Sequence, residues 1–239
     1  MKTAIVGNGN VASHLKKAFE GKMDIVQVNP HTLEGFPDDA DLILLCVTDD
    51  AIFEVAEKLP ETKAIIAHTS GSVPLSLLAE KGSAQGVFYP LQNFTKGVDL
   101  NYQEIPVFIE GSTPKAEKFL EGVAALFSGN IRRADSEERR KLHLASVFAC
   151  NFMNALAGIG TNLLSGTTIP GEVLLPLMRQ TIKKLETLKP EAAQTGPAAR
   201  NDIKTMEKHL EMLAGNDDLI QLYSVFSKLI ATPNYGNGV

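Results

Sequence analysis

The residues best suited to chemistry form a glycine-rich run near the start of the 239-residue chain, Gly7-Asn8-Gly9-Asn10-Val11-Ala12, directly after the apolar segment Thr3–Val6. In the pattern G-x-G-x-x-A, the first glycine permits a tight turn and the second lets a pyrophosphate approach the backbone. The diphosphate then binds main-chain N–H groups at the positive end of the following helix. We therefore predict a dinucleotide site formed by Gly7, Asn8, Gly9, Asn10 and Val11. The alternative is a plain tight turn in another α/β fold.

The end of the next β-rich run, Asp24–Val28, bears on the choice between NAD and NADP. NAD sites usually place Asp or Glu there, to hold the ribose 2′-hydroxyl. This chain instead has Asn29-Pro30-His31-Thr32, with no arginine nearby. Asn29 and His31 can donate hydrogen bonds to a 2′-phosphate that no carboxylate repels. We expect NADP, with NAD as the alternative, unless these residues only form a turn.

Two further loops follow β-rich runs, and open α/β sheets bind ligands at the carboxyl ends of their strands. Val47, Thr48 and Asp49 are expected beside the ribose groups of the cofactor, although Asp49 is also suited to capping the helix at 51–59. The loop from His68 through Ser70 to Ser72 is expected near the nicotinamide. Its serines have an additional capping role. His68 is a candidate proton donor, because a histidine pKa lies near neutrality.

From Leu142 to Gly171 the chain has no Asp, Glu, Lys or Arg. A helix without charges on any side is buried, either in a core or against a partner chain. A membrane span is disfavoured, because polar side chains fall inside the stretch and no second span shelters them. On a helical wheel one face is apolar and the opposite arc is polar. The apolar face carries Phe148, Phe152, Leu156, Ile159 and Leu163, and the polar arc His143, Asn151, Asn154, Asn162 and Ser165.

The polar arc needs hydrogen-bond partners. These are either a neighbouring helix or a substrate at the mouth of the dinucleotide domain. On the second interpretation His143 and Asn151 are site residues. Arg200, after Gly196-Pro197, offers a planar fork for a substrate carboxylate. An ordinary ion pair with Asp202 or Glu207 is the alternative for that arginine.

The order of elements predicts how these residues are positioned. Up to about residue 135, short β-rich runs alternate with amphipathic stretches, a pattern typical of a parallel sheet covered on both faces. After Asp135 the pattern is helical. We predict an α/β fold: a doubly wound Rossmann dinucleotide-binding domain, 1–135, and an all-helical substrate and dimerisation domain, 136–239. Strands are expected at 3–6, 24–28, 42–47, 64–67, 86–88 and 107–109, and helices at 11–19, 51–59, from Pro114, 136–165, 171–188, 197–213 and 217–230.

The composition limits the partners and the compartment. The formal net charge of −5 and the absence of a Lys/Arg cluster disfavour nucleic acid. The apolar run at the N-terminus is too short for the core of a signal peptide. Cys46 and Cys150 lie in apolar segments, which predicts buried thiols in a reducing compartment. We expect a cytoplasmic protein with no metal site and no membrane contact.

Taken together, the motifs resemble a bacterial family of Rossmann-like proteins with a C-terminal helical domain of unknown function, commonly labelled NADP oxidoreductases. The resemblance extends over nearly the whole chain, and the matching segments are 7–12, 47–52, 68–71, 89–92, 143–152, 195–202 and 209–210. Wider relatives are pyrroline-5-carboxylate reductases, deazaflavin-dependent NADP reductases and 6-phosphogluconate-type dehydrogenases. The resemblance implies a homodimer whose helical domain closes over the nicotinamide.

This chain departs from the pattern of these relatives at Tyr89, at Asn201 and in the long helix. Tyr89 stands where relatives often have His, and Asn201 where they have Gly. The long helix also lacks the lysine, four before an asparagine, that serves as the acid/base device of hydroxyacid dehydrogenases. His143 and Asn151 are the nearest substitutes.

The leading hypothesis is an NADP-dependent oxidoreductase acting on a small C=O or C=N substrate. His68 or His143 would be the acid/base group, Asn151 would polarise the substrate and Arg200 would hold a carboxylate. One alternative is a non-catalytic NADP-binding sensor or regulatory dimer. The other is a structural dimerisation module with an empty glycine loop.

Overall fold

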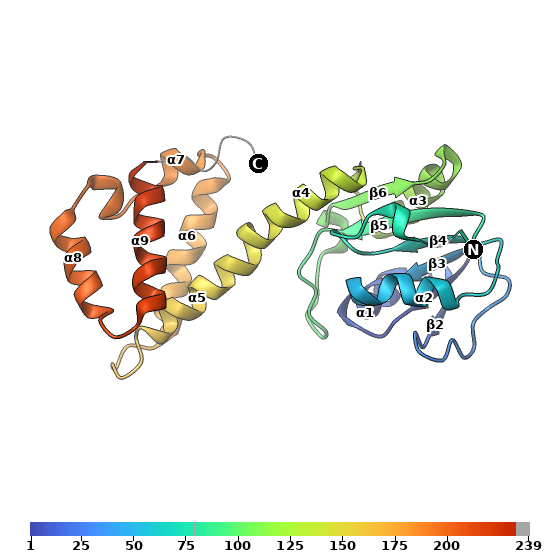
Figure 1. Cartoon of the computed structure of the whole chain (residues 1–239), viewed down its shortest axis with the longest axis horizontal. Helices are drawn as coiled ribbons and strands as arrows, with labels where there is room; N and C mark the ends of the chain where they lie inside the picture. The colour runs from blue at the N-terminus through green and yellow to red at the C-terminus, as the bar shows by residue number, and fades with distance from the viewer. Residues whose placement is uncertain (79, 233–239) are drawn as a thin grey trace. The chain divides into compact units, whose positions relative to one another are not determined.

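A computed structural model describes residues 1–78 and 80–232 of the chain (Figure 1). Contacts divide the chain into two units, Met1–Ala155 and Leu156–Val239. This division falls inside the long helix, because the first part of that helix packs on the sheet. The boundary at 135/136 coincides with the point where that helix begins, and as a domain boundary it stays a prediction.

The first unit is built on a seven-stranded sheet in the order β2-β1-β3-β4-β5-β6-β7. Neighbouring strands are parallel except β5 and β6, which are antiparallel. The predicted α/β class is therefore confirmed. The wholly parallel sheet expected from the sequence is wrong at β6, because no crossover helix joins it to β5. The strands are β1 Lys2–Val6, β2 Asp24–Val28, β3 Leu42–Leu45, β4 Ile65–His68, β5 Ala84–Pro90, β6 Val107–Gly111 and β7 Ile131–Arg133.

Helices cover both faces of this sheet. Successive side chains of β3 point to opposite faces, so Leu42 and Leu44 join one hydrophobic core and Ile43 and Leu45 the other. The first core also contains residues of α1 (Asn10–Phe19) and α3 (Pro114–Phe127), and the second contains residues of α2 (Ile52–Lys58). This is the doubly wound arrangement, and it places the carboxyl ends of β1, β3, β4 and β5 at one edge.

Helix starts follow local signals. Thr113 caps α3, its hydroxyl accepting a hydrogen bond from the Ala116 N–H at 3.2 Å, with proline at the first helical position. Asp135 and Glu138 form a capping box at the start of α4. Both predicted starts are confirmed.

The long helix is not uniform. It consists of α4 (Ser136–Ser146), a π-helical segment η4 (Val147–Phe152) and α5 (Met153–Asn162). A π-turn holds more residues than an α-turn, so a wheel drawn at 100° per residue does not continue through the segment. The side chains are also not buried within one chain, contrary to the interpretation as a core helix: Phe148 is 63% exposed and Leu163 is 56% exposed.

The second unit is helical. Its elements are η5 (Gly171–Leu174), α6 (Leu175–Leu185), α7 (Pro190–Ala193), η6 (Ala198–Arg200), α8 (Ile203–Met212) and α9 (Asp217–Ala231). Among its described residues only Ala198 is buried. Apolar side chains such as Leu177, 66% exposed, therefore remain at the surface of a single chain.

Candidate cofactor and substrate site

The glycine loop has the geometry of a phosphate cradle. Gly7 has φ of 135°, and a Cβ there would collide with the carbonyl oxygen of Cys46 and lie 2.9 Å from its carbonyl carbon. Gly9 is the N-cap of α1, and an added Cβ would meet open space. No side chain caps α1. Within the helix, bonding starts with the Ser13 N–H, which donates to the Gly9 carbonyl at 3.1 Å. The N–H groups before it thus remain for an anion, which is the arrangement a dinucleotide diphosphate requires.

A pocket of about 500 Å³ opens at this loop. Its walls come from the carboxyl ends of β1, β2 and β3, and from α2. Eight of the predicted cofactor residues line it: Gly7, Asn8, Gly9, Asn10, Val11, His31, Val47 and Thr48. Pro30, Cys46 and Thr69, from loops that were expected beside the cofactor, also line it. Sequence reasoning missed Ala51, Glu54, Val55 and Lys58.

Three predicted cofactor residues are outside this pocket lining. The Asn29 carboxamide accepts a hydrogen bond from the His31 N–H at 2.9 Å and so shapes the turn. The Asp49 carboxylate accepts a hydrogen bond from the Ser72 hydroxyl. It makes no capping bond to the helix that follows, contrary to the capping role considered above. Ser70 is buried, and its hydroxyl accepts hydrogen bonds from the Ser72 and Val73 N–H groups, both at 3.1 Å, so it closes a turn within the loop. No side chain caps the short helix Leu75–Leu77 that follows Pro74, so the capping role predicted for these serines is wrong.

Lys58 is the main charged residue that the sequence did not point to. It lies in the last turn of α2 and pairs with Glu54, one turn earlier, at 2.6 Å. The hydrogen bond and charge of Lys58, with a smaller contribution from His31, lower the pKa of Glu54. Lys58 thus brings positive charge to this pocket, and both Lys58 and His31 bring hydrogen-bonding groups to it.

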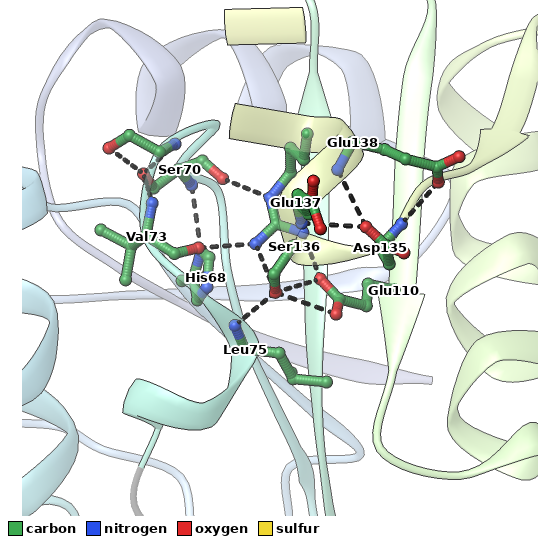
Figure 2. Close-up of polar contacts among 11 residues, drawn as sticks. His68, Ser70, Val73, Leu75, Glu110, Asp135, Ser136, Glu137 and Glu138 are labelled. Atoms are coloured by element: carbon green, nitrogen blue, oxygen red, sulfur yellow. Dashed lines mark hydrogen bonds and ion pairs between the residues drawn. The ribbon is translucent and has the colours of Figure 1, made fainter. Parts of the chain in front are cut away.

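The loop after β4 is held by a buried arginine on α4, Arg139. Figure 2 shows Ser70 and Val73 of the loop together with Glu110 and Ser136 of the same polar network. Arg139 is 0% exposed. Its Nε donates to the Ser70 carbonyl at 3.2 Å and its Nη2 to the Val73 carbonyl at 2.5 Å. Its Nη1 pairs with the Glu110 carboxylate. Ser136 completes the network: its hydroxyl donates to Glu110 at 2.9 Å and accepts from the Leu75 N–H at 3.0 Å. The network fixes the backbone of the 70–75 loop.

His68 lies beneath this loop rather than in a pocket wall. Its side chain is 0% exposed, and Nδ1 accepts a hydrogen bond from the Ser70 N–H at 3.2 Å. Nε2 is buried with no hydrogen-bond partner among the described residues. Burial, reinforced by the charge of Arg139, lowers the pKa of His68 to about 4. The imidazole is therefore neutral at pH 7, which disfavours its predicted role as direct proton donor.

A second pocket, of about 300 Å³, is lined by Tyr89, Leu91, Gln92, Asn93, His143, Ser146, Cys150 and Asn151. The Tyr89 hydroxyl and His143 Nδ1 are 3.3 Å apart. The spacing follows from geometry, because Arg139 and His143 are one helical turn apart on α4, a rise of about 6 Å. A two-residue step along β5, from Val87 to Tyr89, covers about 6–7 Å. His68, Val87 and Glu110 form one row of paired residues across β4, β5 and β6. Arg139 of α4 lies over this row. One turn later along α4, His143 lies beside Tyr89, which is two residues after Val87 on β5.

The two thiols have different environments. Cys46 is buried, as predicted, and burial raises its pKa to about 12. The expectation of burial is wrong for Cys150, which is only half-buried in the second pocket. Its Sγ accepts a long hydrogen bond from the Asn93 amide at 3.8 Å. The helical segments around it bury little: Arg139 is the one buried residue of α4, and η4 has none.

Other predicted site residues lie elsewhere. Asn154 and Asn162 are exposed. Arg200 is exposed in the second unit, where no described residue forms an ion pair with it, so the expected pair with Asp202 or Glu207 is not formed. Asn201 adopts φ of 54°, a left-handed conformation that asparagine tolerates better than most residues. Glycine, which the family resemblance implies at this position, adopts the same conformation without strain.

Comparison with known proteins agrees with this architecture. Residues 105–230 match the family described as a domain of unknown function, DUF2520. A "putative NADP oxidoreductase" from Bacteroides fragilis is 34% identical, with a TM-score of 0.88, covering 96% of this chain and 97% of that one. None of the curated proteins matches.

More distant solved structures share the fold. A protein from Thermotoga maritima is 22% identical, with a TM-score of 0.76, covering 95% of this chain and 99% of that one. A reductive aminase from Aspergillus terreus, in complex with NADPH and ethyl-5-oxohexanoate, is 12% identical, with a TM-score of 0.71 and coverage of 100% and 96%. The resemblance inferred from the sequence motifs is confirmed by these matches. With residues 105–230 matched and a 34% identical relative over nearly its whole length, the chain belongs to the DUF2520 family.

Proposed function

We propose that the protein is an NADP-dependent oxidoreductase that transfers hydride to or from a small molecule with a C=O or C=N bond. The observation that carries the proposal is the pairing of two pockets at one sheet edge. One surrounds the uncapped start of α1, and the other is lined by Tyr89, His143 and Asn151. The 34% identical relative described as an NADP oxidoreductase supports it.

The nucleotide pocket favours NADP over NAD. No carboxylate follows β2 to hold a ribose 2′-hydroxyl, and Asn29 is engaged in its own turn. His31 and Lys58 line the pocket and are suited to a 2′-phosphate. The Glu54 carboxylate beside Lys58 would swing toward solvent, since its side chain is 70% exposed.

In this proposal the bound nicotinamide supplies or accepts the hydride. The chain binds the diphosphate at Gly7–Val11 and shapes the substrate pocket with the clamped 70–75 loop. Asn151 polarises the substrate, and His143 takes part in proton transfer. We assign His68 a positioning role, because its side chain is buried beneath the loop. The proposed role of Arg200 is to hold a substrate carboxylate.

We further propose that the active form is a cytoplasmic homodimer. Phe148, Leu163 and Leu177 are each more than half exposed in one chain, and the described helical unit buries only Ala198. The helix Ser136–Asn162 is long and apolar enough to cross a membrane by length and composition alone. His143, Asn151, Asn154 and Asn162 would be stranded in lipid, so a second copy is the better cover.

The oligomer is tested by light scattering coupled to size exclusion. We expect a dimer for the wild type and a shift to monomer for Leu163→Glu, because a carboxylate on a buried apolar face is costly to desolvate. Lys204→Glu, on exposed α8, is the control. A wild-type protein that is monomeric at micromolar concentration would refute the dimer.

Calorimetry with NADPH and NADH tests the core of the function, followed by NADPH oxidation across a panel of carbonyl and imine compounds. We expect micromolar NADPH binding and weaker NADH binding. No uptake of either nucleotide at millimolar concentration would refute the proposal. Binding without oxidation across the panel would instead indicate a non-catalytic sensor. Full turnover in both His143→Ala and Asn151→Ala would refute their assignment.

A further inference from the structure

Tyr89 and His143 form a pair of titratable rings in the wall of the second pocket. Tyr89 is the penultimate residue of β5, and His143 lies on α4. The hydroxyl oxygen and Nδ1 are 3.3 Å apart, and the rings meet edge to face with centroids 6.3 Å apart. The pair is positioned by two different elements and not by neighbouring residues in the chain.

Gly71 gives these rings their space. A Cβ at this position would lie 2.6 Å from Tyr89 Cζ, 2.8 Å from its hydroxyl oxygen and 2.9 Å from His143 Nδ1. The backbone of Gly71 is outside the left-handed region, so its conformation does not demand glycine. Glycine is required instead by the close approach of the Tyr89 phenol and the His143 imidazole. The Arg139 clamp on Ser70 and Val73 holds the backbone on both sides of Gly71.

The position of Tyr89 in the sheet relates its phenol to the glycine loop. β5 is parallel to β4, β3 and β1, so Tyr89 is at the same carboxyl edge as the glycine loop. The other polar residues of the pocket wall are Gln92, Asn93, Ser146 and Asn151, which are neutral hydrogen-bonding groups. Three groups lining this pocket have protons to exchange by ordinary acid/base chemistry: the Tyr89 phenol, the His143 imidazole and the Cys150 thiol.

We propose that Tyr89 is the proton donor of the reduction, with His143 as the group that returns the proton to it. This inference rests on the proposed function. Hydride adds to the carbon of a C=O or C=N bond, the π electron pair moves to the oxygen or nitrogen, and that atom takes the phenol proton. His143 Nδ1–H then reprotonates the phenolate, and solvent reprotonates His143. The sum is NADPH, a proton and the substrate giving NADP⁺ and the alcohol or amine.

The surroundings keep the phenol protonated near neutrality. Burial raises the pKa of Tyr89 above its ordinary value, as does the charge of Asp49, against the opposing effects of the Ser146 hydroxyl and Arg139. Asp49 follows the end of β3, and Arg139, His143 and Ser146 all lie on α4. A phenol that retains its proton at neutral pH has that proton to give to a substrate oxygen or nitrogen.

A second tyrosine–histidine pair shows what a structural pair looks like. The Tyr102 hydroxyl and His14 Nδ1 are 2.9 Å apart, but His14 Nε2 is also within 2.9 Å of the Thr95 carbonyl oxygen, and the ring is buried. His143 is only half-buried, and its Nε2 has no hydrogen bond to any described residue. It can therefore exchange protons with solvent, as the relay requires.

The kinetic test compares Tyr89→Phe with Tyr102→Phe as the matched control. NADPH affinity is measured by calorimetry. Hydride transfer is measured by stopped flow with compounds bound in solved structures of the same fold: dibenz[c,e]azepine from an imine reductase, and cyclohexanone plus allylamine from a reductive aminase. We expect Tyr89→Phe to bind NADPH within about twofold of wild type and to transfer hydride roughly 10²–10⁴-fold more slowly. Tyr102→Phe should match wild type. A Tyr89→Phe rate within threefold of wild type overturns the proposal.

A spectroscopic test needs no turnover. The tyrosinate absorbance of wild type minus that of Tyr89→Phe isolates one phenol, and its midpoint should lie above the ordinary value of about 10. His143→Phe should raise this midpoint further, because a donor to the phenolate is lost. A midpoint that stays or falls in His143→Phe overturns the relay. If the wild type binds NADPH but reduces neither probe, this spectroscopic test alone decides whether the relay stands. Failure of wild type to bind NADPH refutes the proposed function instead.

Discussion

The Arg139 clamp leads to a quantitative prediction, tested by Arg139→Met. Methionine fills most of the arginine volume but removes every donor, so the half-buried Glu110 carboxylate loses its counter-ion and the Ser70 and Val73 carbonyls lose their donors. Breaking a buried ion pair by removing one partner costs about 3–5 kcal/mol. In a domain of this size each kcal/mol lowers the melting temperature by about 2–4 °C. The expected loss is therefore roughly 6–20 °C.

The assay is thermal unfolding followed by circular dichroism at fixed protein concentration, because any dimer makes the melting temperature depend on concentration. Arg140→Met is the matched control, since Arg140 is exposed and adjacent. Glu110→Gln in the Arg139→Met background should recover part of the loss, because no uncompensated carboxylate remains. A loss below about 2 °C for Arg139→Met, or one equal to that of Arg140→Met, would show that the clamp does not hold the loop as argued.

Three further predictions concern the nucleotide pocket and pH. Gly9→Ala should keep the wild-type melting temperature but weaken NADPH binding by at least about tenfold. Gly7→Ala should also destabilise the fold, because its Cβ would clash with Cys46. Calorimetry and thermal melting together distinguish the two variants. Lys58→Gln should lower the NADPH-to-NADH affinity ratio by about fivefold, with Lys63→Gln as control, and an unchanged ratio would remove Lys58 from the 2′-phosphate site. The pKa of His68 is about 4 in the folded protein and about 6.5 in the unfolded chain. The free energy of unfolding that His68 contributes is therefore full above pH 6.5 and falls by on the order of 3 kcal/mol as the pH drops to 4. Urea unfolding of His68→Gln should lack this fall, and a pH profile identical to that of wild type would contradict the burial argument.

Much of the architecture is predictable because its signals are local. The spacing of glycines after an apolar strand, the Thr113-Pro114 start and the Asp135–Glu138 capping box each depend on a few neighbouring residues. The strand runs were predicted to within two residues at each end for β1 to β6. The reversal at β6, the short β7 and the π-helical segment were missed. Each depends on how distant parts of the chain pair or pack.

The candidate site was only half predictable for the same reason. The glycine loop and the 47–48 turn were found, since they follow strands in the order of the sequence. Lys58 was missed because it reaches the pocket from the far end of a helix. Histidines look alike in sequence, yet His68 is buried with a lowered pKa and His143 faces a pocket.

The sequence by itself determined that a doubly wound domain with a diphosphate cradle is followed by helices, because apolar periodicity and backbone requirements are properties of short segments. Only the tertiary structure decided which side chains act together. Tyr89 and His143 are 54 residues apart. Arg139 reaches back to Ser70 across three strands and a helix, and to Glu110 across a helix and a strand. Such contacts arise from the register of the sheet and the line that α4 takes along β5, neither of which is encoded within a single segment.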